Sequence, residues 1–216
     1  REQRVIGFPQ SPTLTLREKI ITQGSIDCAL HALENGVALN VAGGTHHAFA
    51  DHGEGFCLLN DFAVAAHYLI DRKLARQILV IDLDVHQGNG TAKIFEHDAR
   101  VFTFSMHGAH NYPFRKESSD LDVPLPDGTG DEAYLSLLRE NLDRILEHVQ
   151  PDFACYLSGV DILETDRFGK LKVTMQGCAE RDAYVFRSLH ERRIPVAVAM
   201  GGGYSADHRI IVEAHC

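Results

Sequence analysis

Short apolar runs alternate with longer amphipathic segments along this chain. The runs have the length of strands, and their few polar positions suit strands that are covered on both faces. We expect strands over five ranges: 36–42, 77–83, 100–106, 153–158 and 195–200. Apolar residues at helical spacing predict five helices: 25–35, 60–72, 90–97, 130–149 and 174–192.

The alternation of strand and helix predicts an α/β fold: three layers, with a predominantly parallel sheet and helices on both faces. The chain has no repeat, low-complexity tract or linker, so we expect a single domain over residues 1–216. Sheets of this kind place their functional sites beyond the carboxyl ends of the strands. We therefore expect the functional residues directly after the predicted strands.

Every predicted strand ends in polar or glycine-rich residues. In chain order, the segments are GGTHHA (43–48), DLDVHQGNG (82–90), SMHG (105–108), SGVD (158–161) and GGGY (201–204). One polar strand end is commonplace and carries no functional meaning. Five at the same edge of a sheet predict a site that several strands build together.

Three of these residues suit a metal ion. Asp84 and His86 are two apart in extended chain, so both side chains point to the same face. Asp161 follows another apolar strand and would be a costly buried carboxylate without a partner. Taken singly, each could be an ordinary polar strand end, or part of a phosphate-binding loop. Two oxygens and one nitrogen with a position left open fit a catalytic zinc-type site better than a structural one.

A tandem histidine pair supplies candidate bases. We pair His46 with Asp82, which would raise the basicity of the imidazole, and His47 with Asn89, which orients a ring without stabilising its cation. His47 should therefore titrate lower than His46. The phenol of Tyr204, which follows three glycines, could donate to a developing oxyanion. Together, these residues predict metal-assisted hydrolysis of a carbonyl compound.

Composition narrows the class of protein. The formal net charge is −9 and the pI is about 5.8, which argues against a nucleic-acid-binding surface. No apolar stretch is long enough for a membrane span. The cysteines are scattered without a C-x-x-C pair, at positions 28, 57, 155, 178 and 216. That spacing is typical of a reducing compartment, so we expect a cytoplasmic protein, or a nuclear one in a eukaryote.

Five motifs in this order, GTHHA, GEGFCLLND, DLDVHQGNG, GVDIL and GGGY, resemble those of the histone deacetylase and acetylpolyamine amidohydrolase superfamily. Gln87 and Asn89 make the third motif most similar to the class IV and related bacterial branch. The resemblance implies an arginase/deacetylase-like fold. It also implies zinc-dependent removal of acetyl or longer acyl groups from lysine in a protein or peptide, or from a polyamine or other small amine. Family members usually start earlier in their sequences, so we expect this domain to lack N-terminal and C-terminal elements.

The resemblance also implies roles for individual residues. The metal ligands are Asp84, His86 and Asp161, which would hold Zn²⁺, with Fe²⁺ as the alternative. His46 and His47 activate water and carry its proton to the leaving amine, and Tyr204 polarises the acyl carbonyl. The residues implied to contact the substrate are Gly55, Phe56, Tyr112 and Gly202. A structural monovalent cation, K⁺, would be lined by Asp82, Asp84, His86, Ser105 and Met106.

Other interpretations remain open at this stage. A related hydrolase with two manganese ions would need further carboxylates where Gln87 and Asn89 stand. A module that binds acylated amines without hydrolysing them would not need an intact catalytic set. Phe56 and Tyr112 could equally be packed in the core. We expect His107 and His110 near the mouth of the site, and a solvated acidic loop that contains Glu117, Asp120 and Asp122.

Overall fold

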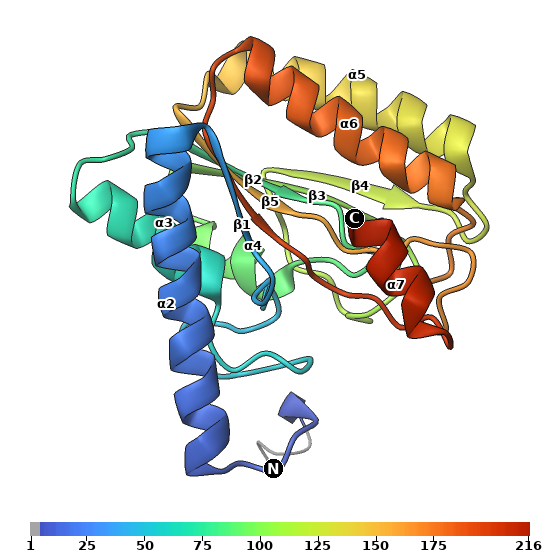
Figure 1. Cartoon of the computed structure of the whole chain (residues 1–216), viewed down its shortest axis with the longest axis horizontal. Coiled ribbons are helices and arrows are strands. Elements are labelled where there is room, and N and C mark those ends of the chain that lie inside the picture. Colours follow the sequence, from blue (N-terminus) through green and yellow to red (C-terminus); the bar gives the residue numbers. More distant parts are fainter. Residues whose placement is uncertain (1–4) are drawn as a thin grey trace.

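The computed structural model describes residues 5–216, which form one α/β unit around a six-stranded parallel sheet (Figure 1). The strands lie in the order β1-β6-β5-β2-β3-β4. Their bounds are β1 Val37–Asn40, β2 Ile78–Asp82, β3 Val101–Gly108, β4 Leu121–Leu125, β5 Phe153–Leu157 and β6 Val196–Ala199. All neighbouring strands pair in parallel, which confirms the predicted fold class.

Helices cover both faces of the sheet (Figure 1). The helices are α2 Pro12–Asn35, α3 Asp61–Asp71, α4 Asn89–Phe95, α5 Asp131–Val149, α6 Met175–Glu191 and α7 His208–His215. Helices α2, α3 and α4 pack on one face, and α5, α6 and α7 pack on the other. Within residues 5–216, no helix combines the length and the apolar character needed to cross a bilayer.

The central strands are apolar on both faces because each face meets a separate core. Leu79 and Ile81 of β2 point into the cluster beneath α5 and α6. Ile78 and Val80, at the alternate positions, point into the cluster beneath α2 and α3. All four side chains are at most 3% exposed. Burial of this kind stabilises the fold by about 1.5–3 kcal/mol for each large aliphatic side chain, and it makes the strands a rigid base for the residues at their ends.

The structure differs from the sequence-based expectation in three elements. Helix α2 begins at Pro12 rather than at residue 25, and Ser11 caps it by accepting a hydrogen bond from Leu14 N at 3.0 Å. Helix α7 follows the last strand and was not predicted. The third difference is the edge strand β4, which was not predicted. Its residues are half-buried or exposed except Leu125, and they include a proline.

The expectation of a solvated acidic loop at 117–122 is partly wrong. Asp122 lies in β4 and its Oδ1 accepts a hydrogen bond from Gln87 Nε2 at 2.8 Å. Asp120 accepts from the backbone N and the hydroxyl of Thr103 on the neighbouring strand, at 2.7 and 2.9 Å. These carboxylates attach the edge strand to the sheet, so they are structural groups as well as surface charges.

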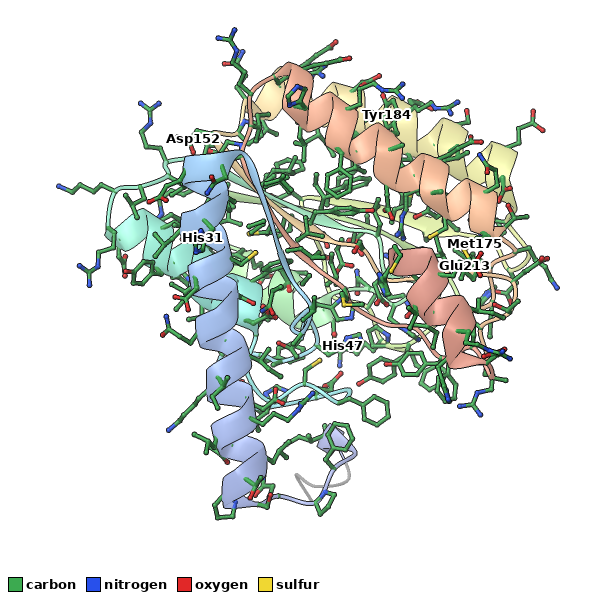
Figure 2. All side chains as sticks on the ribbon, in the orientation of Figure 1. His31, His47, Asp152, Met175, Tyr184 and Glu213 are labelled. Carbon is green, nitrogen blue, oxygen red and sulfur yellow. The ribbon has the colours of Figure 1, made fainter. Side chains whose placement is uncertain are left out.

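The parallel arrangement brings all the carboxyl ends of the strands to one side of the molecule. In Figure 2, Asp152, which directly precedes β5, marks the opposite end of the sheet, and His47 lies in the interior beyond the carboxyl ends. The five polar segments predicted at the strand ends therefore meet in one region, which is described next.

Candidate active site

The loop that carries the two histidines is held in place by the start of α3. Asp61 accepts hydrogen bonds from the backbone N of Gly44 and Thr45, at 3.1 and 2.8 Å, and from the Thr45 hydroxyl at 2.7 Å. Asn60 caps α3 and donates to the carbonyl of Ala48 at 3.1 Å. Both side chains are buried. Asp61 and Asn60 together form a clamp that bends the loop, so that two adjacent histidines face one cavity.

His46 lies in an anionic environment. Its Nδ1 donates to Asp82 Oδ2 at 2.7 Å, and its Nε2 lies 4.0 Å from Asp84 Oδ1. Burial would lower the pKa of His46, but the two carboxylates outweigh burial and raise the pKa to about 9. This environment favours the protonated form of His46.

His47 lies in a neutral environment. Its Nδ1 is 2.7 Å from Asn89 Oδ1, the pairing expected from the sequence. Burial and the adjacent charge of His46 hold the pKa of His47 well below 6.5. Because an amide oxygen only accepts, the proton of the neutral ring lies on Nδ1 and leaves Nε2 as an unprotonated base. The two rings, whose centroids are 4.0 Å apart, thus have opposite protonation preferences.

Asp84, His86 and Asp161 form a compact cluster of potential metal ligands. His86 Nδ1 lies 3.0 Å from Asp84 Oδ1 and 3.1 Å from Asp161 Oδ2. Within the described residues, this is the only group of three or more His, Cys, Asp or Glu side chains with ligand atoms all within 4.8 Å of one another. One nitrogen and two carboxylate oxygens are a donor set that zinc accepts.

Two further observations show that the cluster fits a cation. Asp161 Oδ2 is fully buried, yet it accepts no hydrogen bond of acceptable geometry from any described residue. Burial and the neighbouring charge of Asp84 raise the pKa of Asp161 to about 7. Two buried carboxylates side by side repel unless a cation lies between them, so the arrangement favours a divalent ion.

Gly202 lies close to the same cluster. Its backbone N donates to Asp84 Oδ2 at 2.7 Å. A Cβ at this position would lie 2.1 Å from Asp161 Oδ2 and 2.8 Å from Asp84 Oδ2. Only glycine leaves both carboxylates room to approach one ion.

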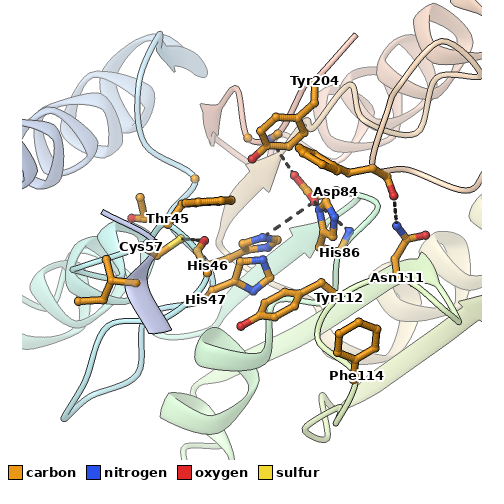
Figure 3. Close-up of a pocket in the computed structure, with 18 of the residues that line it drawn as sticks. Thr45, His46, His47, Cys57, Asp84, His86, Asn111, Tyr112, Phe114 and Tyr204 are labelled. Carbon is orange, nitrogen blue, oxygen red and sulfur yellow. Dashed lines mark hydrogen bonds and ion pairs between the residues drawn. The ribbon is translucent and has the colours of Figure 1, made fainter. Parts of the chain in front are cut away.

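Tyr204 borders the cluster on the side away from the two histidines. The ring of His86 neighbours both, with its centroid 6.4 Å from that of Tyr204 and 6.0 Å from that of His47 (Figure 3). Burial and the charges of Asp84 and Asp161 raise the pKa of the Tyr204 phenol above its usual value. The phenol therefore keeps its proton and is available as a hydrogen-bond donor.

A cavity of about 600 Å³ opens above these groups, and aromatic side chains line its walls (Figure 3). Phe56 is half-exposed and Tyr112 is half-buried, so neither is a core residue. The ring of Tyr112 stands edge-on to that of His47, with centroids 4.9 Å apart. Gly55 adopts a positive φ of 52°, and a Cβ there would lie 2.7 Å from the His47 ring. The predicted substrate-contacting residues thus all line this cavity.

The residues predicted to bind a monovalent cation lie beneath the same site. The register of β2 and β3 places Asp82 beside Ser105. The Ser105 hydroxyl lies 2.9 Å from His107 Nδ1, and His107 is buried in β3 rather than at the cavity mouth. His110 does line the mouth. The K⁺ site itself stays a prediction.

Gln87, whose identity suggested the family branch, contacts none of the reacting groups. Its amide nitrogen donates to the carbonyl of Glu117 and to Asp122, both at 2.8 Å, and its oxygen accepts from Glu117 N at 3.0 Å. Gln87 therefore ties the loop that carries Tyr112 to the end of β2.

Three other buried or half-buried residues support the site and were not predicted. Besides Asp61, these are Glu54, whose carboxylate accepts from Asn89 and Tyr112, and Arg181. Arg181 is fully buried in α6 and donates to the carbonyls of Ser158, Gly159 and Leu83, beside the metal-binding segments. The two acidic residues in GEGFCLLND, Glu54 and Asp61, and the arginine in an otherwise amphipathic helix were the only sequence signals for these roles.

Comparison with known proteins identifies a family. The histone deacetylase domain matches residues 5–214. An uncharacterized protein of Picosynechococcus is 46% identical over 215 residues, which are all of this chain and 72% of that protein. Histone deacetylase 2 of Arabidopsis thaliana is 34% identical over 94% of this chain, which spans only 55% of that protein's length.

The fold comparison agrees with the sequence comparison. The crystal structure of an acetylpolyamine aminohydrolase from Burkholderia pseudomallei superposes with a TM-score of 0.76 and 26% identity. The match covers 90% of this chain and 59% of that one. The arginase/deacetylase-like fold expected from the five motifs is therefore confirmed, and this chain spans just over half the length of these two relatives.

Proposed function

Because this chain belongs to the histone deacetylase family, we propose that it is a zinc-dependent amide hydrolase that removes acetyl or longer acyl groups from lysine side chains or related small amines. One observation carries the proposal. Two adjacent histidines, one held protonated and the other held neutral, lie beside a buried cluster of three metal ligands. A binding or scaffold protein would not require opposite protonation states in two neighbouring rings.

The metal ion would be held by Asp84, His86 and Asp161, with Zn²⁺ as the preferred ion and Fe²⁺ as the alternative. When bound, such an ion supplies Lewis-acid polarisation of the acyl carbonyl and makes water a stronger acid. The peptide N–H of Gly202 orients the Asp84 carboxylate. Asp82, beside Ser105, is also part of the proposed K⁺ site.

His47 is the proposed general base. Its free Nε2 accepts a proton from the attacking water, and its low pKa keeps the ring ready for that step at neutral pH. His46 keeps its own proton and offers positive charge to the tetrahedral transition state, while Asp82 holds its ring in place. The proton then passes from this histidine pair to the nitrogen of the leaving amine.

Tyr204 is the proposed oxyanion donor. Its raised pKa means that the phenol donates a hydrogen bond instead of ionising. As negative charge develops on the acyl oxygen, a fixed donor opposite the histidine pair stabilises that charge more than it stabilises the substrate.

The cavity favours an acyl group on a slender aliphatic amine. Phe56 and Tyr112 offer aromatic walls to a methylene chain, and the reacting groups lie at the inner end. An acyl-lysine side chain and an acylated polyamine share that shape. We therefore propose an acylated lysine in a protein or peptide, or an acylated polyamine, as the partner.

Two rival functions are less well supported. A two-manganese hydrolase would need a second set of ligands, and the described residues contain a single cluster of ligand-type side chains. A module that binds acylated amines without hydrolysing them would not require Tyr204 and the histidine pair beside that cluster.

The direct test is a substrate panel with the zinc-loaded chain. Peptides with acetyl to long-chain acyl lysine and acetylated polyamines are incubated with the protein, and the released amine is measured. We expect turnover of at least one substrate and inhibition by a hydroxamate chelator. A folded, zinc-loaded protein that turns over none of them would refute the proposal.

A further inference from the structure

Glu54 lies beside the histidine pair but forms no hydrogen bond with either ring. Its Oε1 accepts a hydrogen bond from Asn89 Nδ2 at 2.9 Å and another from the Tyr112 hydroxyl at 2.5 Å. The side chain is 20% exposed, and its other oxygen lies 3.8 Å from His52 Nε2. One carboxylate thus joins the group that orients His47 to the aromatic wall of the cavity.

The donor and acceptor inventory makes this contact directional. A carboxylate accepts hydrogen bonds, so it draws the NH₂ of the Asn89 amide toward itself. The amide oxygen must then face His47, and it lies 2.7 Å from Nδ1. An oxygen there requires a proton on Nδ1, which leaves Nε2 of the neutral ring free.

The opposite orientation of the amide would disable the ring as a base. If Asn89 turned its NH₂ toward His47, Nδ1 would become the acceptor and the proton would move to Nε2. The amide oxygen would also face the Glu54 carboxylate, and two acceptors at 2.9 Å repel. An asparagine alone does not distinguish the two orientations, whereas an asparagine beside a carboxylate does.

Tyr112 depends on the same carboxylate. Its hydroxyl donates to Glu54 while its ring stands edge-on to His47, at 89° and with centroids 4.9 Å apart (Figure 3). The carboxylate therefore holds the ring that packs against His47 and forms one wall of the cavity.

We propose that Glu54 is a positioning residue that selects the Nε2-free tautomer of His47 through Asn89 and holds the cavity wall through Tyr112. The catalytic consequence rests on the proposed function, in which His47 is the general base. The tautomer selection itself rests only on the contacts described above. His46 is hydrogen-bonded directly to the carboxylate of Asp82. His47 is linked to the carboxylate of Glu54 through the amide of Asn89.

The test compares Glu54→Leu and Glu54→Ala, which both remove the acceptor oxygen, with wild type in the zinc-loaded full chain. Long-range ¹H–¹⁵N NMR identifies which nitrogen of the His47 ring carries the proton, and steady-state kinetics gives kcat and KM. Tyr112→Phe separates the second contact, and Glu96→Gln, on an exposed surface residue, is the matched control. Thermal unfolding verifies that each variant is folded, and the Leu variant, which keeps more of the side-chain volume, decides the result if the Ala variant does not fold.

Wild type and Glu96→Gln should show one His47 tautomer, with the proton on Nδ1. Both Glu54 variants should show a mixture of the two tautomers. Their kcat should fall in proportion to the fraction of protein that still carries the proton on Nδ1, which is about 2-fold for an equal mixture. Tyr112→Phe should keep the single tautomer and act mainly on KM.

A single Nδ1-protonated tautomer in both folded Glu54 variants would overturn the proposal. A mixture of tautomers without loss of kcat would overturn its catalytic part. If wild type itself turns over no acyl amine, the proposed function fails, and the NMR comparison still decides whether Glu54 selects the tautomer.

Discussion

Replacement of Gly202 by alanine should damage the metal site without unfolding the protein. The added methyl carbon would lie 2.1 Å from Asp161 Oδ2 and 2.8 Å from Asp84 Oδ2. Non-bonded contacts of this kind are favourable only near 3.5 Å, so the Asp161 carboxylate must move by about 1 Å or more. The backbone of Gly202 does not lie in the left-handed region, so the steric contact alone accounts for the effect.

The magnitude follows from that displacement. Disturbing a group that supports a metal ligand typically lowers metal affinity about 10-fold to 100-fold, or about 1.4–2.8 kcal/mol. A reacting group misplaced by about 1 Å lowers the rate about 100-fold. We expect Gly202→Ala to lose zinc affinity in this range and to lose more in kcat/KM, because ligand position affects both binding and chemistry.

The assay is competition for zinc between the protein and a chromophoric chelator, with circular dichroism to verify the fold. Gly130→Ala is the matched control, because a Cβ there has no neighbour closer than 3.8 Å. If folded Gly202→Ala binds zinc as tightly and turns over substrate as fast as Gly130→Ala, the two carboxylates do not act as ligands of a common ion.

Three further predictions concern other parts of the molecule. His47→Ala should abolish turnover and leave zinc bound, as measured by metal analysis after dialysis; loss of the zinc would show that the ring belongs to the metal site instead. Asp61→Ala leaves the backbone N of Gly44 and of Thr45 without their acceptor, so urea unfolding should show a loss of about 1.5–3 kcal/mol and kcat should fall; unchanged stability would mean that the clamp is unnecessary. Burial raises the pKa of Glu18 despite the adjacent Arg17 guanidinium, so the ionised form is disfavoured in the folded state and stability is lost as the pH rises through the titration range. The stabilising effect of Glu18→Gln should therefore grow as the pH rises above the ordinary pKa of glutamate, about 4.3, and a pH-independent difference in urea midpoint would contradict this.

Four of the five strands that the apolar pattern predicted, β2, β3, β5 and β6, lie inside the sheet, and the fifth, β1, is an edge strand with exposed residues at alternate positions. Residues 78–82 and 153–157 are fully buried, so an unbroken apolar run marks them. Strand β4 lacks that mark because it lies at the edge of the sheet and contains Pro124. It is held by contacts between side chains far apart in the chain, such as Gln87 with Asp122. The pattern of apolar and polar residues within a short segment cannot predict such long-range contacts.

The chemistry at the strand ends was predictable because parallel strands deliver their ends to one edge. Asp84 and His86 share a face at a spacing of two, and Asp161 follows the next strand along the sheet. The pairing of His47 with Asn89 was predicted from the chemistry of the two side chains. The groups that orient this site act from loops and helices instead. Glu54 lies 35 positions from Asn89, and only the folded chain brings them together.

The central claim is that one divalent ion at Asp84, His86 and Asp161 supports amide hydrolysis by this chain. The most direct measurement is a titration of the metal-stripped protein with zinc, in which the deacylation rate of an acyl-lysine peptide is followed together with the bound metal. We predict that the rate rises in proportion to bound zinc and reaches its plateau at one ion per chain. A plateau at two tightly bound ions, or a fully loaded and folded chain without turnover, would contradict the account.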